Sequence, residues 1–311
     1  MSSAASRVVV VGSLNADLTV RTERFPQPGE TLAGSELVIV PGGKSANQAA
    51  AAAVLGADVV LFGAVGADPH GELLVQAATT AGVDASRVLR RSGTATGTAM
   101  IVVDAAGENT IIVSPGANGT LAPSDLPADL FEAAAVLCLS LEVPLPTVQA
   151  AARQARAAGV PVLLNLSPYR DVPAELLADT GVLLVNRHEA AQVTGLPDAD
   201  WPGTLEVLTR LGVRRAVVTL GADGAVVLDA DADAGSRVRS VPPVPVTAVD
   251  TTGCGDAFTA ALGACLAAGA DLHAAAAVAA RAGALAATGH GAQSSYPPLG
   301  DLADDVRRSG R

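Results

Sequence analysis

Two glycine-containing segments carry residue types that could bind a polar ligand and transfer a charged group. In the first, GGKSAN at residues 42–47, Lys44 is the only lysine among twenty basic residues, and Asn47 follows one helical turn later. A compact ammonium suits a tight, hydroxyl-lined pocket, and paired glycines let a ligand approach the backbone closely. The segment therefore predicts a ligand site around Lys44, although a glycine turn with a solvated lysine would give the same residues.

The Gly43-Lys44-Ser45 sequence is also how a phosphate-binding P-loop ends. That motif requires a glycine at the position of Val38, which lies in an expected strand. A loop of this kind, wrapped around a triphosphate, is therefore excluded.

The second segment, DTTGCGD at residues 250–256, precedes an apolar helix that is expected to end near Gly269. Glycines at a helix start leave several backbone N–H groups directed at one point, with the positive end of the helix dipole behind them. A carboxylate at Asp256 would repel a bound phosphate. It fits better as a base that takes a proton from a nucleophile while the N–H groups hold a phosphoryl group in transfer. The alternative is a helix start with an acidic first-turn residue and no chemistry.

The elements that must position these loops alternate between β-branched runs and Ala-rich segments. Continuous apolar runs predict strands covered on both faces, as in a parallel sheet. The intervening segments predict helices, including one at 45–55 that Ser45 would cap and one at 147–158. The sequence thus predicts an α/β fold with a central, mostly parallel sheet flanked by helices. The expected strands are 8–11, 59–62, 136–139, 160–164, 182–185 and 216–219.

Two segments lack the expected helices. Residues 19–40 contain strand-like pieces around FPQPGE, and residues 99–113 read as two strands joined by DAAGEN. We expect one domain spanning residues 1–311, with strands from about 14–41 and about 97–115 inserted as a small β-sheet. This sheet could form a lid over a ligand, or it could be a simple edge extension.

Composition limits the classes of partner. A net charge of -11 with no basic stretch argues against nucleic acid. The apolar run at 274–287 is interrupted by Arg281, so no membrane span is expected. Three widely spaced cysteines and an N-terminus without a basic region before its apolar run favour a cytoplasmic protein.

A series of short motifs extends these observations over nearly the whole chain: GSLNADL (12–18), PGETLAG (28–34), GGKSANQAA (42–50), GENTIIVSPGAN (107–118), SLEVPL (140–145), NRHEAAQVTG (186–195), VTLGADGAVV (218–227), VDTTGCGDAF (249–258) and GAQSS (291–295). In this order they resemble the ribokinase-like (PfkB-type) carbohydrate kinase family. The GxGD loop is common to the family, and the GGKxAN and NAD motifs favour its ribose-phosphorylating members.

The resemblance implies a sugar pocket whose amides, carboxylates and single ammonium bind hydroxyl groups. Asp256 would accept the proton of the primary hydroxyl, and the backbone of Gly253, Cys254 and Gly255 would stabilise the γ-phosphoryl charge. By position in the motifs, the sugar-binding residues would be Asn15, Asp17, Gly43, Lys44, Asn47, Glu142 and Asp256.

The resemblance also implies ATP, Mg²⁺ and K⁺. Asn186 and Glu189, spaced as NxxE, look like the family's magnesium–phosphate motif acting through water. The ATP-binding set would be Asn186, Glu189, Thr219, Gly221, Asp223, Gly224 and Gly255. Potassium, bound mostly by carbonyl oxygens, would be held by Asp250, Thr252, Ala286, Gly289, Gly291 and Ser295.

The implied activity is ATP-dependent phosphorylation of ribose at its primary hydroxyl, in a homodimer joined through the lid. Another kinase of the family, acting on deoxyribose, fructose, adenosine or pseudouridine, is the alternative, and a non-catalytic sugar- or nucleotide-binding protein is the distant one. Two residues depart from the family pattern. Ser45 replaces a common glycine, and Cys254 replaces a usual alanine. We expect the helix start to lower the pKa of the Cys254 thiol and to make it sensitive to oxidants.

Overall fold

The computed structural model describes residues 7–197 and 199–302. Within these residues nine strands form the larger sheet, in the order β13-β12-β11-β10-β9-β8-β1-β4-β5. The strands from β5 to β11 pair in parallel, and β12 and β13 are added antiparallel at one edge. The strands are β1 (Arg7–Val11), β4 (Asp58–Gly66), β5 (Val88–Arg91), β8 (Ala134–Leu139), β9 (Val162–Asn165), β10 (Val182–Asn186), β11 (Arg215–Thr219), β12 (Ala225–Asp229) and β13 (Val238–Val241).

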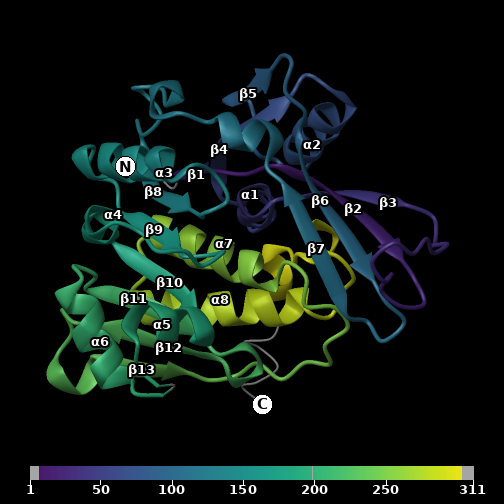
Figure 1. Cartoon of the computed structure of the whole chain (residues 1–311). Coiled ribbons are helices and arrows are strands. Elements are labelled where there is room, and N and C mark those ends of the chain that lie inside the picture. The colour runs from purple at the N-terminus through teal and green to yellow at the C-terminus, as the bar shows by residue number, and fades with distance from the viewer. Residues whose placement is uncertain (1–6, 198, 303–311) are drawn as a thin grey trace.

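Helices cover both faces of this sheet (Figure 1), as its continuous apolar strands require. The apolar residues of α1, α2, α7 and α8 pack on one face, and those of α3 to α6 pack on the other. The helices are α1 (Lys44–Val54), α2 (Pro69–Thr80), α3 (Leu145–Ala157), α4 (Ala174–Asp179), α5 (Arg187–Thr194), α6 (Trp201–Arg210), α7 (Cys254–Ala267) and α8 (Leu272–Ala286). The predicted α/β fold is confirmed, and each of the six expected strands is present.

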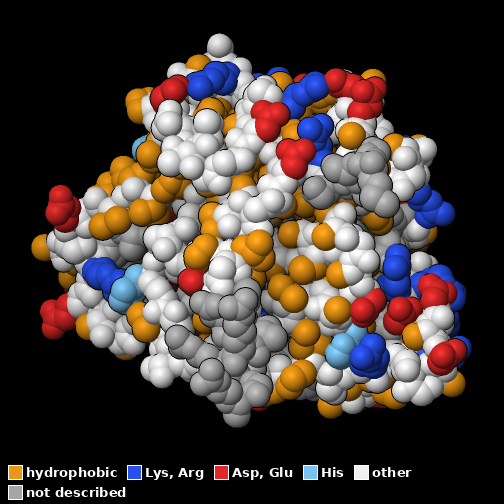
Figure 2. All heavy atoms as spheres, turned by 180° about the vertical axis from the view of Figure 1, so that it is seen from behind, with side chains coloured by type: hydrophobic (Ala, Val, Ile, Leu, Met, Phe, Trp, Pro, Cys, Tyr) orange, Lys and Arg blue, Asp and Glu red, His pale blue; other side chains and the backbone are white. Residues whose placement is uncertain are grey.

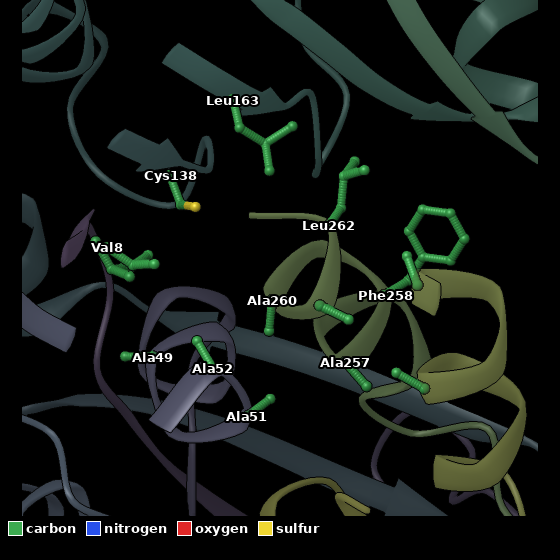
Figure 3. Packing of buried hydrophobic residues seen from close by; sticks show 14 of the residues in the cluster. Val8, Ala49, Ala51, Ala52, Cys138, Leu163, Ala257, Phe258, Ala260 and Leu262 are labelled. Atoms are coloured by element: carbon green, nitrogen blue, oxygen red, sulfur yellow. The ribbon is translucent and has the colours of Figure 1, made fainter. Parts of the chain in front are cut away.

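Small side chains allow α1 and α7 to lie close together on the first face. Figure 3 shows Ala49 and Ala52 of α1 near Ala257 and Ala260 of α7, with Val8 of the central strand beside them. Alanine keeps interhelical contacts short, so the polar N-terminal turns of the two helices can meet at the same edge of the sheet.

The second sheet is small and projects from the body of the molecule (Figure 1). It has the order β3-β2-β6-β7, formed by β2 (Asn15–Arg21), β3 (Val38–Gly42), β6 (Gly97–Val103) and β7 (Asn109–Ser114). The predicted β-sheet from the two helix-poor segments is confirmed. Figure 2, which views the molecule from behind, shows hydrophobic side chains along this projecting sheet.

The start of α1 differs from its prediction. The helix begins at Lys44 with Gly43 as N-cap and without a side-chain cap, so the predicted cap by Ser45 is wrong. The Ser45 hydroxyl instead shares a hydrogen bond with the Ser140 hydroxyl at 2.9 Å. Ser45 is fully buried, and Ser140 follows β8, so this contact ties α1 to the sheet.

Among the described residues, no helix is long and apolar enough to cross a bilayer.

Candidate active site

Residues far apart in sequence meet where the parallel strands β1, β8, β10 and β11 end. The segment after β1 enters the small sheet through β2, and the segment after β8 carries Glu142. The N-terminal turns of α1 and α7 reach the same region, because Asn47 of α1 hydrogen-bonds Asp256 of α7. Open α/β sheets bind ligands at this carboxyl edge.

The residues predicted to bind the sugar include three carboxylates, Asp17, Glu142 and Asp256, and one ammonium, Lys44. Glu142 Oε2 accepts hydrogen bonds from the Lys44 backbone N–H at 2.9 Å and from the Ser13 hydroxyl at 2.5 Å. Asp17 projects from β2 against Gly42, where an added Cβ would lie 2.1 Å from its Oδ2. Burial, together with the negative charges of Glu142 and Asp256, raises the pKa of Asp17 to about 7. These carboxylates are therefore close enough to engage one small ligand.

Asn15 and Gly43 shape the same site from the backbone side. Asn15 is buried, and its Oδ1 accepts from Asn118 Nδ2 at 2.8 Å. Asn118 also joins the Leu14 backbone N–H and carbonyl, at 3.0 and 2.9 Å. Gly43 has φ +89, and a Cβ there would lie 2.8 Å from the Asn15 nitrogen, so only glycine fits.

Asp256 is buried and held by two amides. Asn47 Nδ2 donates to Oδ2 and Gln48 Nε2 donates to Oδ1, each at 3.1 Å. Burial raises the pKa of Asp256, while Lys44 and the two amide hydrogen bonds lower it. A buried carboxylate with a raised pKa is a stronger proton acceptor than an exposed one, as a general base requires.

Four polar residues of this site were missed by sequence reasoning: Ser13, Gln48, Asn118 and Gln293. Ser13, Gln48 and Asn118 are buried, and Gln293 donates to Asn47 Oδ1 at 3.0 Å. Gln48, Asn118 and Gln293 each stand inside a motif quoted for the family resemblance, at 42–50, 107–118 and 291–295. Ser13 belongs to the 12–18 motif. Their place in those motifs was the available signal. For Gln48 there was a second one, because a polar residue inside an apolar helix requires a buried partner.

The start of α7 has the geometry of an anion site. Gly253 is the N-cap with φ +76, and a Cβ there would lie 2.7 Å from Ala292 Cβ and 2.9 Å from the Tyr296 hydroxyl. A helix leaves its first N–H groups without intrahelical acceptors. The Cys254 N–H donates to the Thr251 carbonyl at 3.3 Å, a long bond within the same turn. The predicted amides thus lie directly beside Asp256.

An apolar groove of about 370 Å³ opens next to this helix start. Thr219, Gly221, Gly224 and Gly255, all predicted to bind ATP, line it together with Phe258 and side chains of α8. Its apolar walls suit a flat base, with the phosphate end toward Gly255. Asp223 is a partial exception, because it is exposed and its carboxylate pairs with Arg187 at 2.7 Å.

The NxxE pair forms a capping box at the start of α5. Asn186 Oδ1 accepts from the Glu189 N–H, and Glu189 Oε2 accepts from the Asn186 N–H, both at 2.8 Å. The two side chains therefore have a structural role that explains their spacing. Asn186 ends β10 and pairs with Thr219 at the end of β11, which lines the groove, and Glu189 follows in the first turn of α5.

The predicted potassium residues come from two loops that contact each other. Asp250 Oδ1 accepts from the Thr252 N–H and Oδ2 accepts from the Gly291 N–H, each at 2.9 Å. The Gly289 N–H donates to the Ala286 carbonyl, and Ser295 packs on Gly289. Within residues 7–197 and 199–302, no group of three His, Cys, Asp or Glu side chains is arranged so that it could hold a metal ion.

The expected lowering of the pKa of Cys254 is wrong. Burial and the charges of Asp250 and Asp256 raise the pKa of the thiol instead of lowering it. Burial and two neighbouring carboxylates both disfavour the thiolate, and together they outweigh the effect of the helix dipole.

These features are typical of an α/β phosphotransferase, with a buried carboxylate between a polar pocket and an apolar groove. Residues 5–299 match the profile of the pfkB family carbohydrate kinases. The chain therefore belongs to the pfkB family, and it is an ATP-dependent carbohydrate kinase.

Relatives and solved structures agree with this membership. The chain is 34% identical to a ribokinase of Bacillus subtilis, with 95% of this chain and 97% of the relative covered. It is 37% identical to a ribokinase of Schizosaccharomyces pombe, with 94% and 95% covered. The structure of Arabidopsis thaliana ribokinase complexed with ribose and ATP matches with a TM-score of 0.89 at 31% identity, covering 96% of this chain and 97% of that one.

Proposed function

We propose that this protein transfers the γ-phosphoryl group of ATP to the primary hydroxyl of ribose, giving ribose 5-phosphate and ADP. One contact carries the proposal. Asn47 belongs to the GGKSAN segment at 42–47, which we call the sugar segment, and it donates to Asp256. Asp256 is the third residue of α7, whose start lines the apolar groove described above, here called the nucleotide groove. A single carboxylate therefore adjoins both the sugar and the phosphate, as in-line transfer requires.

The reaction follows from this arrangement. Asp256 accepts the proton of the primary hydroxyl as its oxygen bonds to the γ-phosphorus and the bond to the β-phosphate oxygen breaks. The negative charge on the transferring group develops beside the N-terminus of α7, where Gly253, Cys254 and Gly255 present backbone N–H groups. Lys44 stands near enough to Asp256 for its charge to lower the pKa of that carboxyl group.

Ribose fits the polar groups better than a larger acceptor. Asp17, Glu142, Lys44 and Asn47 supply acceptors and donors on several sides, which a small polyhydroxyl ligand can satisfy at once. Among the relatives with 32–37% identity, the two reported above are ribokinases.

Magnesium fits the residues near the phosphate end of the groove. Glu189 uses Oε2 in its helix cap, so its second carboxylate oxygen can accept a hydrogen bond from a metal-bound water. Magnesium, when bound with ATP, would neutralise phosphate charge. We assign potassium to the two contacting loops around Asp250 and Gly291, which are joined because the Gly291 N–H donates to Asp250 Oδ2. Backbone carbonyl oxygens of these loops would be its main ligands.

Two further parts of the proposal concern the whole protein. The small sheet β3-β2-β6-β7, which we call the lid sheet, exposes apolar side chains such as Met100, Ile111 and Ile112, which supports a homodimer through the lid. The three cysteines are free thiols, which supports a reducing, cytoplasmic location.

The function is tested by measuring ADP release with ribose, deoxyribose, fructose, adenosine and pseudouridine at equal concentrations. We expect ribose to give the highest kcat/KM. A higher kcat/KM for a nucleoside or a hexose would show that this compound, and not ribose, is the preferred acceptor. No ADP release above background with any of the five compounds would refute the proposed kinase mechanism.

A further inference from the structure

A glutamine from the end of the chain reaches the sugar segment. Gln293 Nε2 donates to Asn47 Oδ1 at 3.0 Å, across a sequence separation of 246 residues. Gln293 belongs to a short 3₁₀ turn, Gln293–Ser295, in the loop after α8. The loop is anchored on its other side by the Gly291 N–H, which donates to Asp250 Oδ2 at 2.9 Å. The position of Gln293 is therefore well defined.

The direction of this hydrogen bond fixes the orientation of Asn47. An asparagine amide can turn by 180°, which exchanges its donor and its acceptor. An ionised carboxylate only accepts, so Asn47 must direct Nδ2 toward Asp256. With Oδ1 then on the far side, a donor is needed there, and Gln293 supplies it. Without Gln293, Oδ1 of Asn47 would lose its hydrogen-bond partner, and the Asn47 amide would be freer to turn away from Asp256.

The two oxygens of Asp256 are held differently. Oδ1 accepts from Gln48, which lies one residue after Asn47 on α1 and is 1% exposed. Oδ2 depends on Asn47, whose 6% exposure leaves little room for water to replace a lost partner. Two successive hydrogen bonds, from Gln293 to Asn47 and from Asn47 to Asp256, therefore hold Oδ2 of Asp256 in place.

We propose that Gln293 is a positioning residue for phosphoryl transfer, which acts by fixing the orientation in which Asn47 binds both the sugar and the base. The proposal rests on the proposed function, since it assigns Asp256 as the base and Asn47 to the sugar pocket. Gln293 itself contacts neither the acceptor nor the phosphate in this account.

Gln293→Met keeps the length of the side chain and removes its donor. We expect kcat/KM for the acceptor to fall about tenfold, the scale for losing a hydrogen bond that supports a charged group. We expect the dissociation constant of ribose, measured by calorimetry without ATP, to rise in the same variant, because Asn47 becomes free to turn. Gln293→Ala should give the same result, and it serves if the methionine variant does not fold.

A double-mutant cycle separates positioning from a general loss of structure. In an Asn47→Ala background, Gln293→Met should change kcat/KM and ribose affinity less than twofold, because the residue through which it acts is gone. Gln76→Met is the matched control. Gln76 lines the same surface groove as Gln293, but its amide donates to Thr80 on its own helix. We expect this control to keep wild-type activity.

Two results would overturn the proposal. One is a Gln293→Met enzyme with wild-type kcat/KM and ribose affinity. The other is a loss of equal size in the wild-type and Asn47→Ala backgrounds, which would show that Gln293 acts independently of Asn47. Wild-type turnover of ribose is measured first and tests the proposed function alone. If another acceptor is preferred, the same cycle is run with that acceptor, so the two failures remain distinguishable.

Discussion

At the scale of residues, the chemistry depends on where charge is buried. Asp17, Glu142 and Asp256 are close enough for their charges to interact, and Lys44 is the ammonium that lowers the pKa of Asp256. Like charges in a partly dry site favour proton uptake. The three carboxylates therefore repel one another, and a ligand with several hydroxyl groups can stabilise their charges by donating hydrogen bonds to them.

Asp256→Asn tests the base directly. The substitution keeps the shape of the side chain and removes its ability to accept a proton, so kcat should fall by about 100-fold or more. Ribose and ATP affinities, measured separately by calorimetry, should change much less. Turnover close to that of the wild type would show that another group takes the proton.

Asp17→Asn tests the burial of negative charge. The pKa of Asp17 is about 7 in the folded protein and 3.8 for an ordinary aspartate, so the folded state binds the proton more tightly. As the pH rises from about 4 to 7, the ligand-free wild type must ionise this group and loses stability. The asparagine variant avoids that loss, so its unfolding temperature should exceed that of the wild type above pH 7, by about 2 °C or more, and match it near pH 4.

The exposed Asp301→Asn is a suitable control for the titration, since it should shift the unfolding temperature at neither pH. The same Asp17→Asn variant should bind ribose more weakly at pH 8. An Asp17→Asn protein with no pH-dependent gain in stability would contradict the raised pKa.

Individual residues show where sequence reasoning is sufficient. The meeting of Asp256, Lys44, Asn47 and Glu142 was predicted from motifs. The contacts of Gln48 and Gln293 were not, because a hydrogen bond across more than 200 residues depends on how two helices pack. The cap by Ser45 and the pKa of Cys254 were wrongly predicted for a similar reason. Each local rule was outweighed by the surroundings of the residue. Ser140 takes the Ser45 hydroxyl in one case, and burial with the charges of two nearby aspartates raises the pKa of Cys254 in the other.

At the scale of elements, the lid sheet has apolar side chains exposed on both faces. Leu18, Met100 and Ile112 are paired across β2, β6 and β7 and form one row of side chains. Asp17, Ala99 and Val113 form the adjacent row on the same three strands. Because successive side chains alternate, the second set lies on the face that carries Asp17. The exposed apolar residues of the lid are Leu37, Val38, Ile39, Val40, Met100, Ile111, Ile112 and Val113.

A pair of neighbouring substitutions tests the proposed dimer. Ile111 and Ile112 are 51% and 59% exposed and point to opposite faces of the lid. If two lids pack face to face, a lysine on the buried face should convert a dimer into a monomer, while a lysine on the other face should not. Light scattering after gel filtration of Ile111→Lys and Ile112→Lys measures this. A monomeric wild type, or two dimeric variants, would contradict a dimer through the lid.

The loop pair around Asp250 leads to a prediction about ions. Replacing potassium by sodium at equal ionic strength should lower kcat/KM several-fold, about 1 kcal/mol or more, because sites built from carbonyl oxygens discriminate between potassium and sodium. A titration of each chloride salt with ribose and ATP held constant is the measurement. Equal activity in both salts would remove the ion from the account.

Elements themselves were well predicted, since their signals are local. Continuous valine and leucine runs marked the buried strands, and two segments without helical pattern marked the lid. Sequence could not give the strand order, or the antiparallel addition of β12 and β13, because both depend on long-range pairing. The NxxE spacing illustrates the limit, since a capping box and a magnesium motif require the same residues.

At the scale of the whole molecule, α7 connects the two halves of the reaction. Its first turn lines the nucleotide groove, its third residue is Asp256, and its body contacts both α1 and α8. The sugar segment on α1 and the groove beside α8 are therefore positioned by one helix packed on the central sheet (Figure 1). A lid that closes over the sugar would exclude water from this junction and limit ATP hydrolysis.

The most direct test of the account is the position of the phosphate in the product. Wild-type enzyme is incubated with ATP and ribose, and the product is examined by phosphorus and proton nuclear magnetic resonance. The account predicts a phosphate ester coupled to the two protons at carbon 5 and one ADP per ester. A phosphate at the anomeric carbon, or ADP formed without any sugar ester, would contradict it.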